Sequence, residues 1–197
     1  QQGLRRLRAD SGGKLSRVAE MPAKKLFIEI FRHPDAPRNG HAIQREAVRG
    51  IIRAQNRLLM IYSTVNHDYK FPGGGRKDGE SLPQTLRREV QEECGASVTR
   101  IERFLGSVIE YDLPYENGYQ LFRMTSYYYL CQISERHQPL HLDEYEQRLG
   151  FTPVWVDIED ALRANRAVLN SRFSNIPKWT ERETRVLEFI RQHLIKG

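Results

Sequence analysis

The sequence contains little cysteine and no long apolar run. Its only cysteines, Cys94 and Cys131, each lie inside an apolar pattern, which favours two buried thiols in a reducing compartment over one disulfide. No stretch of about 18 apolar residues occurs, so a membrane-spanning helix is not expected. A charged segment followed by a signal-peptide core is also missing. We therefore expect a cytoplasmic protein without a membrane partner.

Several ligand-binding signatures are missing as well. The six histidines do not show the spacing of zinc ligands. No GxxxxGK[ST] motif is present, so the three glycines at 73–75 are not a P-loop. No internal repeat is visible, and 197 residues are typical of one domain with a small appendage.

Basic charge is concentrated at one end. Of the formal net charge of +6, residues 1–25 hold seven basic residues against Asp10 and Glu20, a net of +5, which leaves +1 for the other 172 residues. We predict a basic, flexible arm over residues 1–24 and a single domain over residues 25–197. A solubilising tail is preferred to a nucleic-acid-binding arm.

The most informative stretch runs from Phe71 to Ala96. Gly73, Gly74 and Gly75 give a backbone that can turn tightly and approach a ligand closely. Ser81 and Gln84 form a capping-box pattern, and Pro83 fits the first helical turn. Apolar residues then recur every fourth position before Gly95, a typical C-terminal stop. The pattern predicts a helix over residues 82–94.

The same helix carries acidic residues at one side. Glu89, Glu92 and Glu93 stand at i, i+3 and i+4, so their carboxylates converge. A solvated acidic face is the ordinary interpretation of such a pattern. The alternative is a site for a hard divalent cation, because Mg²⁺ prefers a few carboxylates together with water and substrate phosphates.

The spacing of the stretch decides between these interpretations. It resembles the signature of the Nudix hydrolase family at seven positions, which are Gly74, Glu80, Arg88, Glu89, Glu92, Glu93 and Gly95. Ala96 departs from the larger aliphatic residue that the family usually has there, which concerns packing rather than ligation. The resemblance covers this box tightly and residues 46–168 loosely. It implies an α/β fold, an α/β/α sandwich with a mixed sheet and the box loop and helix at its centre.

The resemblance also implies roles for individual residues. Mg²⁺, with Mn²⁺ as an alternative, is expected on Glu89, Glu92, Glu93 and the carbonyl of Gly74. Glu89 and Glu93 are therefore also candidate catalytic residues, and Arg88 is expected to pair with Glu80 and orient the loop and helix.

Substrate contacts and a general base are expected outside the box helix. Tyr69, Lys70, Gly73 and Gly75 are candidate substrate-binding residues, although ordinary loop chemistry would also explain the first two. The acidic loop at 141–147 is expected to supply a general base. There we prefer Glu144 to Glu146, because it lies deeper within the loop; a solvated acidic loop is the alternative.

The remaining elements are predicted from local patterns. Strands are expected at 25–32, 47–52, 57–63, 97–113, 121–133 and 153–156. A helix is expected to begin at the Asp157 cap and run to about residue 167. Thr180 and Glu183 form a second capping-box pattern, which predicts the start of the last helix.

The expected activity is hydrolysis of the pyrophosphate bond of a nucleoside diphosphate linked to another moiety. Modified nucleoside triphosphates, ADP-ribose, other nucleotide sugars and dinucleoside polyphosphates are all open as substrates. Two alternatives are a non-catalytic module that senses a nucleotide and an RNA-end pyrophosphohydrolase. A small nucleotide is the expected partner, nucleic acid is not, and both a monomer and a homodimer are compatible with the sequence.

Overall fold

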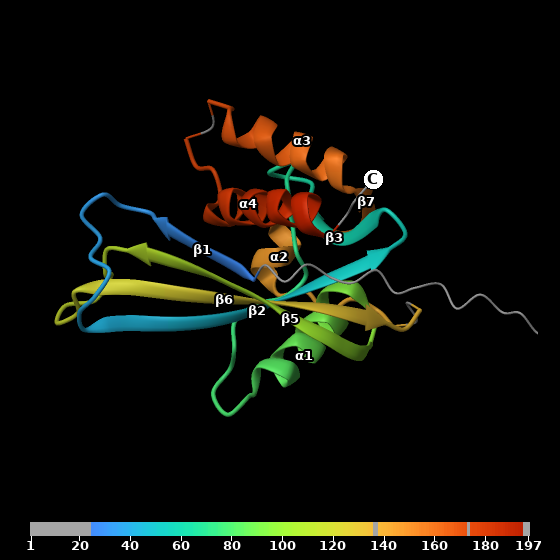
Figure 1. The fold of residues 1–197 in the computed structure, drawn as a ribbon, viewed down its shortest axis with the longest axis horizontal. Coiled ribbons are helices and arrows are strands. Elements are labelled where there is room, and N and C mark those ends of the chain that lie inside the picture. Colours follow the sequence, from blue (N-terminus) through green and yellow to red (C-terminus); the bar gives the residue numbers. More distant parts are fainter. Residues whose placement is uncertain (1–24, 136–137, 173, 195–197) are drawn as a thin grey trace, which may run out of the picture.

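The structure is a computed structural model that describes residues 25–135, 138–172 and 174–194. The predicted basic arm over residues 1–24 lies outside the described residues. Seven strands form the sheet: β1 (Leu26–Phe31), β2 (Ala42–Ala54), β3 (Arg57–Ser63), β4 (Tyr69–Lys70), β5 (Val98–Asp112), β6 (Leu121–Ile133) and β7 (Phe151–Asp157) (Figure 1). The helices in the described ranges are α1 (Leu82–Cys94), α2 (Glu144–Arg148), α3 (Ile158–Leu169) and α4 (Lys178–His193).

The sheet is mixed, as the sequence predicts. Its strand order is β1-β5-β6-β2-β3-β4, and β7 pairs with β3 off this path. The β1–β5 and β2–β6 pairs are parallel, whereas the β5–β6, β2–β3, β3–β4 and β3–β7 pairs are antiparallel. Strands far apart in the sequence therefore become neighbours at the centre of the sheet.

Helices cover both faces of this sheet (Figure 1). On one face, α3 and α4 pack on a core that includes Ile51, Met60, Phe71 and Tyr128. On the other face, the apolar stripe of α1 packs on a core formed by β2, β3, β5, β6 and β7. The α/β/α sandwich is thus confirmed, with the box helix on one of its outer layers.

The box helix has the predicted bounds and caps. Ser81 accepts a hydrogen bond from the Gln84 backbone N–H, and the Gln84 side chain reaches back to the Ser81 N–H, which completes the capping box. Gly95 ends the helix in the left-handed conformation, with φ 62°. Capping of this kind satisfies terminal backbone groups that otherwise have no partner. The start and end of α1 are therefore fixed by local sequence.

Two local predictions for other parts of the chain are wrong. Thr180 and Glu183 do not cap the last helix, because α4 already begins at Lys178 with Pro177 as its N-cap. The hydroxyl of Thr180 instead donates to Asp68, and Glu183 is buried among other polar side chains. The segment predicted as an acidic loop contains a short helix, α2, whose own capping box joins Asp143 and Glu146.

The burial of both cysteines agrees with the prediction of two buried thiols. Cys94 and Cys131 are both buried, and burial raises the pKa of the Cys131 thiol to about 12. In the described ranges, no helix is both long and apolar enough to cross a bilayer.

Candidate active site

Two glutamates of α1 point toward the protein rather than into solvent. Glu89 and Glu93 are 8% and 1% exposed. Glu93 accepts a hydrogen bond from the backbone N–H of Gly73 at 2.7 Å and forms an ion pair with Lys70 Nζ at 2.5 Å. A single carboxylate thus fixes the helix against the glycine loop and against the end of β4.

Arg88 gathers the other carboxylates of the box. Its guanidinium makes a two-pronged contact with Glu80, from Nε at 2.7 Å and from Nη2 at 2.9 Å. The remaining Nη1 lies 2.6 Å from Glu89 Oε1 and 3.0 Å from Glu92 Oε2. Hydrogen bonding by Arg88 lowers the pKa of the Glu80 carboxyl to about 2. The structure therefore brings together Arg88 and Glu80, which the sequence predicts as an orienting pair.

The cluster keeps an excess of negative charge. Four carboxyl groups, on Glu80, Glu89, Glu92 and Glu93, contact two cations in these pairs, so the formal charge is four negative and two positive, a net of −2. Burial, followed by the charge of Glu93, raises the pKa of Glu89. Added positive charge would favour the ionised form of this carboxyl.

The backbone of Gly74 lies close to the carboxylate of Glu89, and the groups around them can be compared with the ligands that a divalent cation needs. A Cβ built on Gly74 would lie 2.5 Å from Glu89 Oε2, so any side chain at this position would require the Glu89 carboxylate to shift. The Gly74 carbonyl itself accepts a hydrogen bond from the Val48 N–H. Among the residues described, no three His, Cys, Asp or Glu side chains are arranged so that they could hold a metal ion as they stand, and Arg88 contacts oxygens of Glu89 and Glu92. The donor set and its net charge nevertheless fit a divalent cation.

The glycine loop is held along the backbone of β2. Val48 N–H donates to Gly74, Gly50 N–H donates to Pro72, and Arg76 N–H donates to Glu46. Gly73 has φ 137°, and a Cβ there would overlap the Val48 carbonyl. The loop can therefore follow the strand only with glycine at this position.

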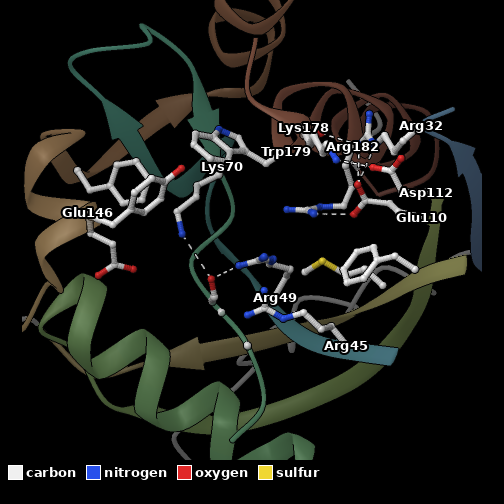
Figure 2. Close-up of a pocket in the computed structure, with 17 residues that line it drawn as sticks. Arg32, Arg45, Arg49, Lys70, Glu110, Asp112, Glu146, Lys178, Trp179 and Arg182 are labelled. Atoms are coloured by element: carbon white, nitrogen blue, oxygen red, sulfur yellow. Dashed lines mark hydrogen bonds and ion pairs between the residues drawn. The ribbon is translucent and has the colours of Figure 1, made fainter. Parts of the chain in front are cut away.

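A cavity of about 390 Å³ opens beside this loop (Figure 2). Of the predicted substrate-binding residues, Lys70, Gly73 and Gly75 line it. Tyr69 does not: its ring packs on Tyr62, with centroids 4.9 Å apart, and its backbone bonds to Asn165. The other lining residues come from many elements: Arg32, Arg45, Arg49, Gly74, Glu110, Asp112, Phe122, Met124, Tyr145, Glu146, Phe151, Lys178, Trp179 and Arg182.

The acidic segment turns a different glutamate toward the site than the one preferred from sequence. Glu146 lines the cavity and lies against Glu93, whereas the Glu144 side chain is 93% exposed and pairs with Arg148 at 3.7 Å. The preference for Glu144 assumed a loop, but in a helix the direction of a side chain depends on helical phase. Burial, and then the charge of Glu93, raises the pKa of Glu146 to about 7.

Buried charges connect the cavity wall to α4. Arg182 is 4% exposed and pairs with Glu110 at 2.7 Å and with Glu183 at 2.8 Å. Arg32 also pairs with Glu110, at 2.6 Å. Burial alone would raise the pKa of Glu110, but the charges of Arg182 and Arg32 lower it.

Sequence reasoning did not identify this network, although a signal was present. Arg182 continues the apolar stripe of Val186 and Ile190 at four-residue spacing, where a charged residue is unusual. Arg49 likewise shares one face of the buried strand β2 with Ala47 and Ile51. A charge at a core position is rarely buried without a partner.

Arg49 reaches the glycine loop from the centre of the sheet. Its guanidinium donates to the Gly73 carbonyl, and Lys70 Nζ lies 3.4 Å from the same oxygen. Both side chains are buried. Two cations therefore contact the same carbonyl of the loop (Figure 2), and Lys70 also pairs with Glu93 of α1.

One family model and several solved structures are similar to this chain. A model described as the NUDIX domain matches residues 43–175. A NUDIX hydrolase from Nitrosomonas europaea is 21% identical, with 73% of this chain and 90% of that chain covered and a TM-score of 0.49. A MutT structure from work on Aliivibrio salmonicida and Vibrio cholerae is 22% identical, with 76% and 99% covered and a TM-score of 0.45. A MutT NUDIX hydrolase from Burkholderia pseudomallei is 16% identical, with 73% and 97% covered and a TM-score of 0.47.

Proposed function

Because this chain belongs to the Nudix hydrolase family, we propose that it hydrolyses the pyrophosphate bond of a nucleoside diphosphate linked to another moiety, with Mg²⁺ as cofactor. The oxygen of water attacks one phosphorus, the bridging P–O bond breaks, and the bridging oxygen leaves with the other phosphate. The products are a nucleotide and the phosphorylated second moiety. Members of the family are pyrophosphohydrolases. For this chain, the nucleotide substrate and the requirement for Mg²⁺ are proposals.

The observation that carries the proposal is the set of carboxylates on one side of α1. Glu89, Glu92 and Glu93 would hold the metal, with the Gly74 carbonyl as a further oxygen ligand. A divalent cation held there would supply positive charge to the phosphate oxygens and make the attacking water more acidic. The net charge of −2 in the contacts of the cluster supports this assignment.

The other residues of the site would orient these ligands and bind anionic oxygens. Arg88 holds Glu80, Glu89 and Glu92 in one arrangement. Lys70 and Arg49 fix the carbonyl of Gly73 and bring positive charge to the cavity wall. Positioned cations of this kind stabilise charge that develops on phosphate oxygens.

Glu146 is the better candidate for the proton acceptor. It lines the cavity and its pKa is raised to about 7, and an acid or base acts best when its pKa lies near the working pH. Glu144, with an exposed side chain, has no comparable contact with the site. We therefore replace Glu144 by Glu146 in the proposed catalytic set of Glu89, Glu93 and Arg88.

Metal removal and a single substitution test the proposal. The purified chain is incubated with a panel of nucleoside diphosphate derivatives and Mg²⁺, and the products are identified by mass. Glu93→Gln should lower turnover by roughly 10²- to 10³-fold, comparable to the loss of one principal electrostatic stabiliser. Glu159→Gln, on the exposed surface of α3, is the matched control and should keep the wild-type rate. Full activity in EDTA, or a wild-type rate for Glu93→Gln, would refute the proposal.

A further inference from the structure

Trp179 forms part of the cavity from outside the segment that matches the family. It lies near the start of α4, after residue 175 where the family match ends. Its ring packs edge-on against Phe151, with centroids 6.1 Å apart, and remains partly exposed to the cavity. Figure 2 shows Trp179 above the opening, with Arg45 and Arg49 below it. Trp179 and Phe151 thus form an aromatic part of the cavity wall, with Lys70 over the Phe151 ring, and Arg45 and Arg49 lie across from Trp179 (Figure 2).

The indole is held in place by a buried carboxylate. Its only polar atom, Nε1, donates to Asp68 Oδ2 at 2.8 Å, and the Thr180 hydroxyl donates to the same oxygen at 2.6 Å. Asp68 is fully buried on the segment that leads into β4. Because the N–H is used inside the protein, the indole can offer a ligand only the surface of its ring.

The part of the cavity wall beside the glycine loop is cationic and suits the phosphate groups of a ligand. Arg45, Arg49 and Lys70 line it beside the glycine loop, where phosphate oxygens would be attracted by charge. Phe122 and Met124 add apolar surface to the same cavity. A ligand with a diphosphate at one end and a planar apolar group at the other would match both sides.

We propose that Trp179 is a specificity-determining residue, on which the planar ring of the substrate packs while the diphosphate lies at the box. The ligand is an aromatic ring attached to a diphosphate, and the ring is the nucleobase of the substrate. It rests on the proposed function for the position of the diphosphate. Stacking of a base on an aromatic side chain tolerates different bases, since every base has a π-face. Asp68 acts as the positioning residue, because it fixes the plane of the indole.

The chain offers a matched fluorescence design, because it contains only two tryptophans. The other, Trp155, is 40% exposed on β7 and does not line this cavity. Trp155→Phe leaves Trp179 as the only reporter, and Trp179→Phe leaves Trp155. Each variant is titrated with the α,β-methylene analogues of ADP and UDP and with methylenediphosphonate, a diphosphate without a ring. Binding is measured in parallel by calorimetry.

Quenching by both nucleotide analogues in Trp155→Phe, with none from methylenediphosphonate and none in Trp179→Phe, is the expected result. Quenching by only one of the nucleotide analogues would also support the inference and would limit the ring to a purine or a pyrimidine. Nucleotide binding without any change in Trp179 emission would overturn it, as would equal quenching by the ring-free compound. Failure of every nucleotide analogue to bind would overturn it too.

Kinetics separate this inference from the proposed function. Trp179→Leu should raise KM for a nucleotide substrate by about ten-fold or more, from the loss of one stacking contact, while Trp179→Phe should recover most of the affinity. Asp68→Asn should raise KM more than it lowers kcat, because it loosens the indole rather than the box. A wild-type KM for Trp179→Leu would refute the inference and leave hydrolysis untouched. Quenching without any metal-dependent hydrolysis would refute the proposed function alone.

Discussion

Replacement of Arg182 by methionine should strongly destabilise the protein. Its guanidinium, 4% exposed, stands between Glu110 and Glu183. Without it, Glu110 keeps Arg32, but Glu183 keeps only the Tyr128 hydroxyl at 3.1 Å and the distant Arg49 Nε at 3.9 Å. The substitution therefore leaves a fully buried carboxylate without a close cation.

The magnitude follows from the cost of an unpaired buried charge. Removing one partner of a buried ion pair typically costs about 3–5 kcal/mol in the free energy of unfolding. For a domain of this size each kcal/mol lowers the thermal midpoint by roughly 2–4 °C, so the midpoint should fall by roughly 6–20 °C. Thermal and urea unfolding followed by circular dichroism would measure both quantities.

Arg185→Met is the matched control on the same helix. Arg185 is an exposed residue that pairs with Glu181 one turn earlier, and such pairs contribute about 0–1 kcal/mol. The double variant Arg182→Met/Glu183→Gln should lose less stability than the sum of the two single variants, with a coupling of roughly 0.5–3 kcal/mol. If Arg182→Met unfolds within about 1 kcal/mol of Arg185→Met, the network does not stabilise the fold as argued.

Two more predictions concern the candidate site. In EDTA, the metal-free chain should lose stability as pH rises from about 4.5 to about 7, because the raised pKa of Glu146 means that folding favours its protonated form. Glu146→Gln should remove that part of the pH dependence and Glu144→Gln should not, so thermal midpoints that change alike with pH in both variants would contradict the assignment. Gly74→Ala should fold but lose about 10²-fold in turnover, because its Cβ would displace the Glu89 carboxylate; kcat and the circular dichroism spectrum check it, and an undiminished kcat would refute it.

The box could be predicted from sequence because its determinants are local. The capping pair Ser81 and Gln84, the four-residue apolar stripe and Gly95 all lie within one helix and its ends. Helical geometry then dictates that Glu89 and Glu93 share a side. No information from the rest of the fold is needed for these inferences.

The cavity could not be predicted in the same way because it joins distant segments. Trp179 meets Asp68 across 111 residues and Arg182 meets Glu110 across 72 residues. The pattern at Thr180 resembled a helix cap, yet its hydroxyl bonds across 112 residues to Asp68. Short helices such as α2 pose a related problem, because the direction of Glu146 depends on where the first turn begins.

The position of α4 in the chain has a consequence for synthesis and folding. The carboxylates of the box are made well before Trp179 and Arg182, and the contact between Arg32 and Glu181 closes a span of 149 residues. Until that closure, the apolar face that α4 covers has no partner from this helix. Contacts between such distant residues slow folding, since the entropy of a long loop must be lost before they form. A nascent chain that lacks α4 should therefore expose the apolar sheet face that this helix covers.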